Sequence, residues 1–251
     1  MRVIILGSGS KGNSTLLIGN NKKILIDVGF SYPKMLKELS LYNVLPQDID
    51  AILITHTHSD HIQGLSTFVK KNHPKVYANS KMLKELLKVV SEDDLTIEED
   101  DFMIDEFNIG IVHTSHDAPG SVGFIIDDNN TSLVYVTDTG YLNKTYLKKM
   151  TNKNVYIFES NHDINMLMTG PYPYILKQRV LSDKGHLSNE TAGIYLNKLI
   201  GNNTKKIVLA HLSEINNTPE IALQTVKSYI SNNDILLETA SQSESLDLGE
   251  I

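Results

Sequence analysis

The sequence contains no cysteine, although it has 251 residues. The chain can therefore form no disulfide and offer no thiolate to a metal. This composition fits a reducing compartment, and we expect the protein to be cytoplasmic. Any metal must be held by histidine, aspartate or glutamate. Such ligands suit zinc, manganese or iron, and ligand type alone does not choose among the three.

Long apolar runs are also missing. No stretch of about 18 apolar residues is present, so the sequence predicts no membrane span. Residues 1–12 predict a strand rather than the basic and then apolar segments of a signal peptide. Apolar residues still make up 41% of the chain, which is enough for a sizeable core.

Positive charge is scarce. The net charge is -7, and the chain has only two arginines, Arg2 and Arg179. A protein that coats nucleic acid nonspecifically needs many basic contacts, so this balance counts against tight generic binding. It does not count against a phosphodiester entering a metal site, because two divalent ions would offset the negative charge locally.

Predicted strands and helices are mixed in both halves of the chain. Apolar strands are expected at 2–6, 14–18, 23–27, 51–55, 122–127, 133–137, 155–159, 206–210 and 235–238. Helices are expected at 32–39, 62–71, 81–90, 142–150, 189–199 and 219–231, and over most of 163–181. The acidic stretch 91–101 is expected to be a solvated loop.

No linker rich in proline, glycine or serine separates the halves. We therefore expect one domain over residues 1–238, of α/β class, with two packed sheets and helices outside. The tail, residues 239–251, is polar and acidic and need not be ordered.

The clearest functional motif directly follows the strand expected at 51–55. Four potential ligands lie within six residues there: His56, His58, Asp60 and His61. At a strand end, the first two can point to one side, while the last two, at the turn into a helix, can point to a neighbouring position. One short loop can thus serve two adjacent ions. A chance cluster of surface histidines is a poor explanation for this HxHxDH spacing.

Three further candidates are expected at strand ends downstream, namely His116, Asp138 and His211. Taken singly, His116 could be a core or surface histidine, and Asp138 a residue of a plain turn. His113 competes with His116 but lies inside a strand-like segment. His73 is expected to be merely solvated.

The HxHxDH motif and the order of these later candidates resemble the metallo-β-lactamase superfamily. The resemblance implies a four-layered αβ/βα sandwich with a two-metal site. It assigns one ion to His56, His58 and His116, the other to Asp60, His61 and His211, and Asp138 to both. It also implies that Asp27 orients the histidine loop, since metal-bound histidines need such partners.

A two-metal site of this kind has a definite chemistry. A hydroxide held between two ions is a nucleophile at neutral pH, because metal binding lowers the pKa of water from about 16 to about 7. The same ions polarise the electrophile and stabilise the leaving oxygen. A pair about 3.5–4 Å apart matches in-line attack on phosphorus. We count Asp60 among the catalytic candidates as well as the ligands.

The segment 7–12 carries a GxGxxG spacing, which in other proteins binds dinucleotides. That interpretation needs a helix after the last glycine, and residues 13–18 predict a strand instead. We expect a tight loop near the metals that offers donors to an anionic substrate from Ser10, Lys11 and Asn13. A simple β-turn remains an open alternative.

A locally basic stretch precedes the helix expected at 189–199. Arg179 lies shortly before His186, and Ser188 is a natural N-cap. Free N–H groups at this helix start can hold a phosphate, so Arg179 and Ser188 are candidate substrate contacts. An ordinary capped surface helix is the alternative.

Two histidines are candidates for proton transfer to the leaving oxygen, His186 and His162. We favour His186, because Gly185 before it permits close approach and the following cap fixes the loop.

Several unusual strings are similar to the YycJ/WalJ (VicX) group of small bacterial proteins within this superfamily. The similarity runs almost from end to end and includes residues 7–14, 159–163, 170–173, 185–189 and 211–213. It implies a 5′→3′ DNA exonuclease with a role in DNA maintenance. It also implies genetic linkage to a cell-wall two-component system.

We therefore expect a metal-dependent phosphodiesterase with DNA as its substrate. One alternative is a thioester or lactone hydrolase on the same metals, and another is a non-catalytic regulator of cell-wall signalling. All seven ligand positions are filled, which argues against a dead site. A carboxylate at Asp138, in a chain without cysteine, argues against the main zinc β-lactamase type. The oligomeric state is not indicated.

Overall fold

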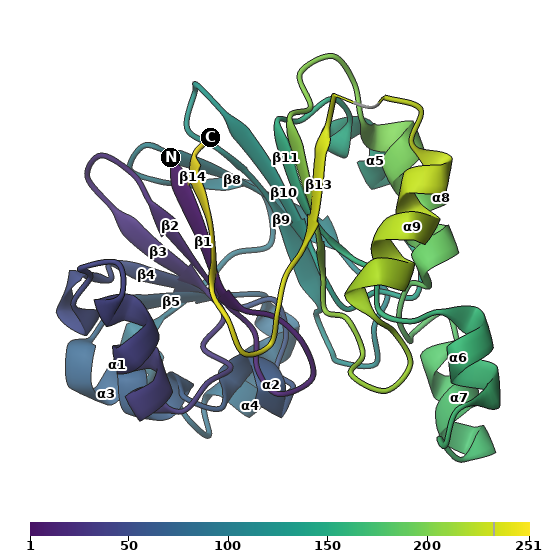
Figure 1. The fold of residues 1–251 in the computed structure, drawn as a ribbon. Helices are drawn as coiled ribbons and strands as arrows, with labels where there is room; N and C mark the ends of the chain where they lie inside the picture. Colours follow the sequence, from purple (N-terminus) through teal and green to yellow (C-terminus); the bar gives the residue numbers. More distant parts are fainter. Residues whose placement is uncertain (233) are drawn as a thin grey trace. The chain divides into compact units, whose positions relative to one another are not determined.

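The computed structural model describes residues 1–232 and 234–251. Two compact units are present, and each contains strands and helices (Figure 1). The first comprises Met1–Ile111, Ala118–Val122 and Ser241–Ile251, and the second comprises Val112–Asp117 and Gly123–Ala240. None of the helices in the described residues has the length and apolar content that a membrane span needs.

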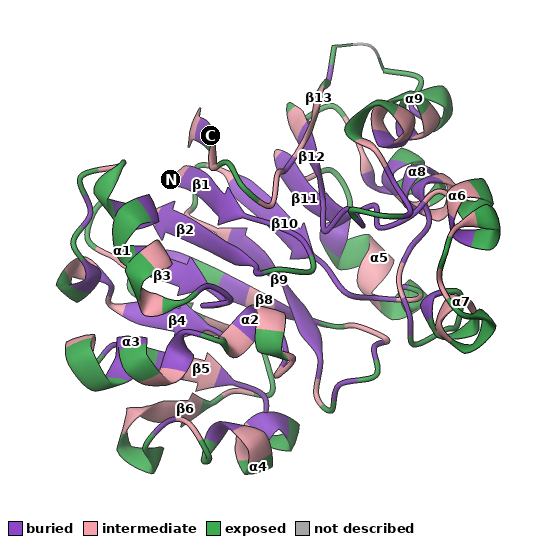
Figure 2. Ribbon diagram, turned by 60° about the horizontal axis from the view of Figure 1, so that its bottom comes forward, coloured by how far each residue is buried: buried purple, intermediate pink, exposed green. Residues whose placement is uncertain are grey.

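The first unit contains a mixed sheet with the strand order β14-β1-β2-β3-β4-β5-β6. β1 pairs antiparallel with both β14 and β2, whereas β3 to β6 run parallel to one another. The strands from β1 to β4 are apolar and almost wholly buried, as Figure 2 shows in purple. The strands are β1 (Arg2–Gly7), β2 (Ser14–Ile18), β3 (Lys23–Ile26), β4 (Ala51–Leu53), β5 (Lys75–Ala78), β6 (Leu95–Ile97) and β14 (Leu246–Glu250).

Short helices connect these strands. The α-helices are α1 (Tyr32–Ser40), α2 (Ser59–Ile62), α3 (Leu65–Asn72) and α4 (Leu83–Leu86). The 3-10 helices are η1 (Pro46–Asp48), η2 (Ser80–Met82) and η3 (Glu92–Asp94). The single helix expected at 62–71 is divided between α2 and α3. Gly64 lies at the break, where a Cβ would be 2.0 Å from the carbonyl oxygen of Phe30.

The second unit contains strands in the order β13-β12-β11-β10-β9. β10 to β13 are parallel to one another, and β9 is antiparallel to β10. Here the strands are β9 (Val122–Asp127), β10 (Ser132–Val136), β11 (Val155–Glu159), β12 (Lys206–Ala210) and β13 (Leu236–Thr239). β8 (Phe107–His113) crosses from the first unit into the second and pairs antiparallel with β7 (Phe102–Ile104).

The described residues of the second unit form the helices α5 (Lys144–Met150), α6 (Ile164–Thr169), α7 (Tyr174–Val180), α8 (Asn189–Leu199) and α9 (Pro219–Tyr229). α8 and α9 pack on β11 and β12 through one buried cluster that includes Phe158, Leu196, Leu209 and Val226. This packing holds the C-terminal ends of the parallel strands in place. Several of the candidate site residues lie at these strand ends.

Two segments that the sequence predicts to be irregular contain strands. In the acidic stretch, Leu95–Ile97 forms β6 beside β5. In the tail, Leu246–Glu250 forms β14 beside β1, where Arg2 makes an ion pair with Asp247. This part of the tail is therefore ordered, although its composition does not require order.

Candidate functional site

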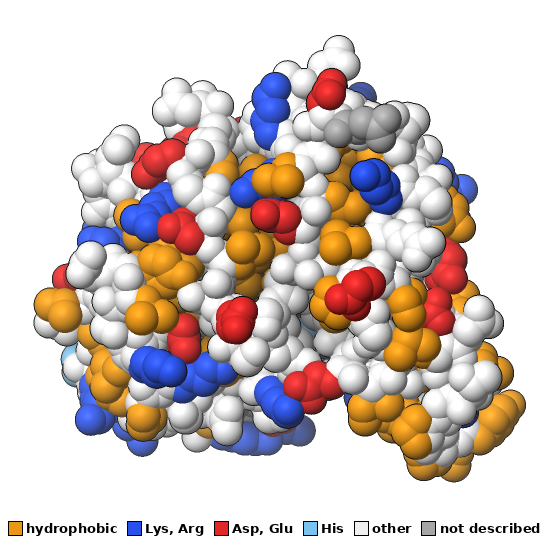
Figure 3. Space-filling view, in the orientation of Figure 1, with side chains coloured by type: hydrophobic (Ala, Val, Ile, Leu, Met, Phe, Trp, Pro, Cys, Tyr) orange, Lys and Arg blue, Asp and Glu red, His pale blue; other side chains and the backbone are white. Residues whose placement is uncertain are grey.

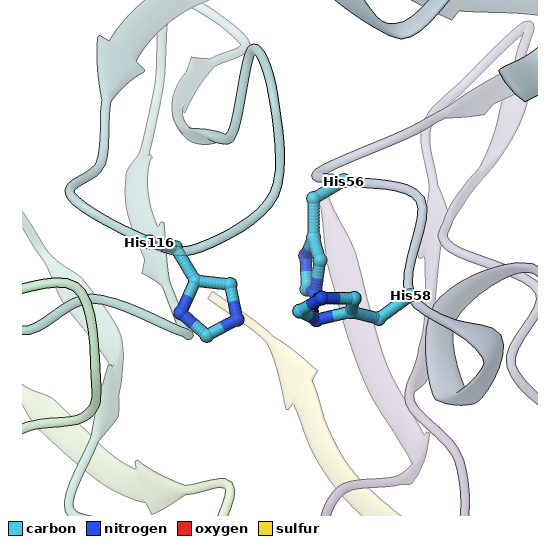
Figure 4. A group of neighbouring side chains, drawn as sticks. All are labelled: His56, His58 and His116. Atoms are coloured by element: carbon cyan, nitrogen blue, oxygen red, sulfur yellow. Dashed lines mark hydrogen bonds between the residues drawn. The ribbon is translucent and has the colours of Figure 1, made fainter. Parts of the chain in front are cut away.

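The HxHxDH loop connects β4 to α2, as the sequence predicts. His56 and His61 are fully buried, while His58 and Asp60 are partly exposed. Nε2 of His56 lies 3.1 Å from Nδ1 of His58, and the two rings meet edge to face (Figure 4, which also draws His116). Nε2 of His61 lies 3.5 Å from Oδ2 of Asp60.

These two separations fit pairs of ligands on a metal ion. Bonds from zinc to nitrogen or oxygen are about 2.0–2.2 Å long, so two ligand atoms of a tetrahedral shell lie about 3.4 Å apart. The loop therefore offers two adjacent ligand pairs, His56 with His58 and Asp60 with His61. The first unit alone thus offers one pair of candidate ligands for each of two metal ions.

Asp27 fixes the orientation of this loop. Its buried carboxylate accepts hydrogen bonds from Nδ1 of His61 at 2.7 Å, from the Thr55 hydroxyl at 2.7 Å and from the Thr55 N–H at 2.8 Å. Burial raises the pKa of Asp27, and the bonds from His61 and Thr55 counter part of that rise. With Nδ1 of His61 donating to a carboxylate, its Nε2 is left to act as a ligand atom.

The glycine loop lies near the candidate ligands, as expected, and the role of Asn13 as a substrate contact stays a prediction. Asn13 is fully buried, and its Nδ2 lies 3.0 Å from Nε2 of His61, so it contacts the ligand set directly. Ser10 and Lys11 are exposed in the same loop, and their role as substrate contacts stays a prediction. β2 follows the loop with no helix between, which rules out the dinucleotide interpretation of the glycines.

The second unit brings together the other three predicted ligands. Asp138 follows β10 and His211 follows β12. Oδ1 of Asp138 lies 3.8 Å from Nε2 of His116 and 3.4 Å from Nε2 of His211. One carboxylate oxygen thus lies near the ligand atoms of two histidines that the family scheme assigns to different ions. A bridging carboxylate requires such a position.

Backbone strain marks the same positions. Asp27, Asp138 and His211 have φ angles of 60°, 55° and 56°, in the left-handed region that side chains other than glycine seldom adopt. Such strain costs about 1–3 kcal/mol per residue and occurs preferentially at functional sites. Asp27 and His211 directly follow β3 and β12, and Asp138 is the second residue after β10, so all three lie where a strand ends.

Glu159, at the end of β11, is a functional candidate that sequence reasoning missed. Its side chain is fully buried, and its Oε1 lies 2.7 Å from Nδ1 of His186 and 3.4 Å from Nδ1 of His211. Its Oε2 accepts the N–H groups of Thr139 at 2.9 Å and Leu187 at 3.1 Å. The carboxylate therefore connects the loops of three site residues.

Electrostatics keep Glu159 ionised. Burial by itself would raise the pKa of Glu159, but the charge and hydrogen bond of His186, and then the hydrogen bond of His211, outweigh burial and hold the pKa at about 2. Asp138, Glu159, His186 and His211 each offer an atom within 4.8 Å of the others. A buried glutamate at the end of an apolar strand was the available sequence signal, because such a residue is rarely buried without partners.

The two candidate proton donors have different surroundings. His186 is held by Glu159, and its side chain is 20% exposed. His162 is buried, and neither of its ring nitrogens has a hydrogen-bond partner among the described residues. Burial lowers the pKa of His162 to about 4, so this ring is neutral at pH 7. These surroundings favour His186 over His162 as the proton donor.

The two predicted substrate contacts of the second unit are engaged with the protein itself. Nε of Arg179 makes an ion pair with Asp117 at 2.6 Å. Ser188 is buried, and its hydroxyl accepts the N–H of Thr191, which caps α8 as predicted. Their contact with a substrate stays a prediction.

Comparisons with known proteins agree with this geometry. Residues 7–211 match the family model of the metallo-beta-lactamase superfamily. The chain is 41% identical over 245 residues to exodeoxyribonuclease WalJ of Streptococcus pneumoniae, covering 92% of this chain and 88% of that one. It is 37% identical over 240 residues to exodeoxyribonuclease YycJ of Bacillus anthracis, covering 90% and 88%.

A solved structure shows the same fold. The metallo-beta-lactamase fold protein YhfI from Bacillus subtilis superposes with a TM-score of 0.77 at 18% identity, over 98% of both chains. This confirms the expected sandwich class for a single domain. The clustered histidines and aspartates suit two divalent metal ions. The chain belongs to the metallo-β-lactamase superfamily and, within it, to the family of the WalJ and YycJ proteins.

Proposed function

We propose that this chain is a metal-dependent phosphodiesterase that removes nucleotides from an end of DNA in the 5′→3′ direction. The pair formed by Glu159 and His186 next to Asp138 carries the proposal. An alkoxide that leaves phosphorus needs a proton. The imidazole of His186, held by Glu159, lies beside Asp138 and is placed to supply it. The names of the two exodeoxyribonuclease relatives support DNA as the substrate.

We propose further that the chain holds two ions, with the ligands that the resemblance to the family implies. Their ligands are His56, His58 and His116 for one ion, Asp60, His61 and His211 for the other, and Asp138 for both. The ligand pairs of the HxHxDH loop and the position of Asp138 beside His116 and His211 support this assignment. When bound, zinc, manganese or iron supplies a nucleophile from water at neutral pH and stabilises charge on phosphate oxygens.

His186 is the proposed proton donor. Its Nδ1 donates to Glu159, so the other ring nitrogen, Nε2, is the atom that can pass a proton to the leaving oxygen. Glu159 acts through His186 and is a positioning residue. General acid catalysis of this kind contributes about 10²–10⁴-fold to a rate.

The variant His186→Ala tests this role. We expect kcat on DNA to fall by about 10²–10⁴-fold while metal content stays near that of the wild type. The loss should be smaller on bis-p-nitrophenyl phosphate, because p-nitrophenolate leaves without protonation. The matched control is His113→Ala, since His113 is exposed at the end of β8. Loss of one metal in His186→Ala would instead make His186 a ligand.

The polarity and substrate are tested with end-labelled oligonucleotides. A strand labelled at its 5′ end should release labelled mononucleotide at once, and a strand labelled at its 3′ end should shorten gradually. Label released first from the 3′ end would contradict the direction. Hydrolysis of thioesters or lactones without any cleavage of DNA would overturn the proposal itself.

A further inference from the structure

The segment between Glu159 and His186 forms an arm made of α6 and α7, hereafter the α6–α7 arm (residues 163–184). Apolar side chains gather over it at the lower right of Figure 3. Tyr174 is 72% exposed and Ile175 is 83% exposed, the highest values among the exposed large apolar side chains of the described residues. Ile164, Met168 and Leu181 are exposed on the same arm.

The charge of this arm differs from that of the chain. The whole chain has a net charge of -7, whereas the arm carries Lys177, Arg179 and Lys184 against Asp163 and Asp183, a net charge of +1. Arg179 pairs with Asp117, which lies outside the arm. A local excess of basic side chains in an otherwise acidic chain favours an anionic ligand for this surface, because the rest of the chain carries the repelling charge.

The base of the arm packs on the catalytic candidates. The His186 N–H donates to the carbonyl of Val180 at 3.0 Å, so α7 ends against the loop of the proposed proton donor. A Cβ on Gly140, two residues after Asp138, would lie 2.4 Å from the backbone of Asp183. A strand lying along the arm would therefore run from the proposed site of cleavage onto Tyr174 and Ile175.

We propose that the α6–α7 arm binds the single-stranded part of a DNA substrate by stacking bases on Tyr174 and packing them against Ile175. This inference rests on the proposed function. Stacking on an exposed aromatic ring accepts any base, which suits an enzyme that moves along a strand. Pro171 and Pro173 are exposed at the turn between the helices and restrict its backbone, so the platform is preformed.

The test measures binding separately from cleavage. The probe is a fluorescein-labelled dT12 with phosphorothioate linkages, added to the manganese-loaded protein and followed by anisotropy. Tyr174→Ala should weaken binding about tenfold, in line with the stacking contribution of one base. Tyr174→Phe keeps the ring and should bind within about twofold of the wild type. The matched control is Met103→Ala, which removes a side chain 67% exposed on β7.

A second variant tests the charge argument. Ile175→Glu should weaken binding more at low salt than at high salt, because salt screens the added repulsion. In cleavage assays, the wild type should show a lower KM for dT12 than for a dinucleotide, and Tyr174→Ala should lose most of that difference. Circular dichroism and metal content check that the variants are folded and loaded.

Two results would overturn the inference. One is wild-type affinity in both Tyr174→Ala and Ile175→Glu. The other is a wild-type dimer in sedimentation that these variants convert to monomers with unchanged DNA affinity, because the arm would then bind a second copy of the chain. If the wild type binds the probe through Tyr174 but cuts no DNA, the proposed function fails and the arm stands as a binding surface.

Discussion

Replacement of Glu159 by glutamine exchanges one carboxylate oxygen for an amide nitrogen and removes the negative charge. This side chain contacts three loops of the candidate site. The pKa of Glu159 is about 2, against an ordinary value of 4.5, although burial opposes ionisation. The charge and hydrogen bond of His186, and then the hydrogen bond of His211, outweigh burial. A neutral amide removes the charge that faces Nδ1 of His186, and the loss of general acid catalysis costs about 10²–10⁴-fold. We expect kcat on DNA to fall about 10²-fold.

The assay compares Glu159→Gln with wild type on DNA and on bis-p-nitrophenyl phosphate. Loss of proton donation should reduce turnover of DNA much more than turnover of the activated ester. The matched control is Glu220→Gln, because Glu220 is exposed in the first turn of α9. Turnover of DNA within about threefold of wild type would refute the reasoning. Equal loss on both substrates with one metal missing would show that Glu159 only supports the ligands.

Three further predictions concern the ligands, pH and salt. Asp138→Ala should lower both metal content and turnover. His73→Ala, which alters the C-cap of α3, should leave both unchanged. Equal turnover of the two variants would disprove the ligand assignment. Because burial lowers the pKa of His162 to about 4, the unfolded chain binds a proton at higher pH than the folded chain does. The free energy of unfolding should therefore fall as pH drops from 6.5 towards 4. In urea unfolding of the metal-free protein, the fall between pH 7 and pH 5 should be about 2 kcal/mol smaller in His162→Asn than in wild type. An equal fall in both proteins would show that His162 is not the cause. Binding of single-stranded DNA should be weak and should fall with salt, with a log–log slope of about -2 for three phosphate contacts; a salt-independent affinity would indicate another ligand.

The regular elements of the core could be predicted because local pattern decides them. Apolar runs between turn residues place β2 at Ser14–Ile18, and the N-cap Ser188 places the start of α8, as the structure confirms. β6 and β14 are different, because each is short, only partly buried and stabilised by pairing with β5 or β1. β14 pairs with residues more than 240 positions away, and no local pattern specifies such a contact.

The site shows a similar division. The motif spacing singled out the HxHxDH loop, and the strand ends placed Asp138 and His211. Spacing could not show the role of Glu159, because its partner His186 is 27 residues away across the α6–α7 arm. Nor could it show that Asn13 turns inward to His61, since that contact depends on the packing of two loops.

The central claim is that two metal ions, held by the seven predicted ligands, carry out cleavage of DNA. The most direct measurement titrates manganese into chelator-treated, dialysed protein and follows both bound metal and release of nucleotide from 5′-labelled DNA. The account predicts no activity without metal, full activity at about two bound ions per chain, and at least as much activity with manganese as with zinc. Full activity in excess chelator, or full activity with a single bound ion, would contradict it.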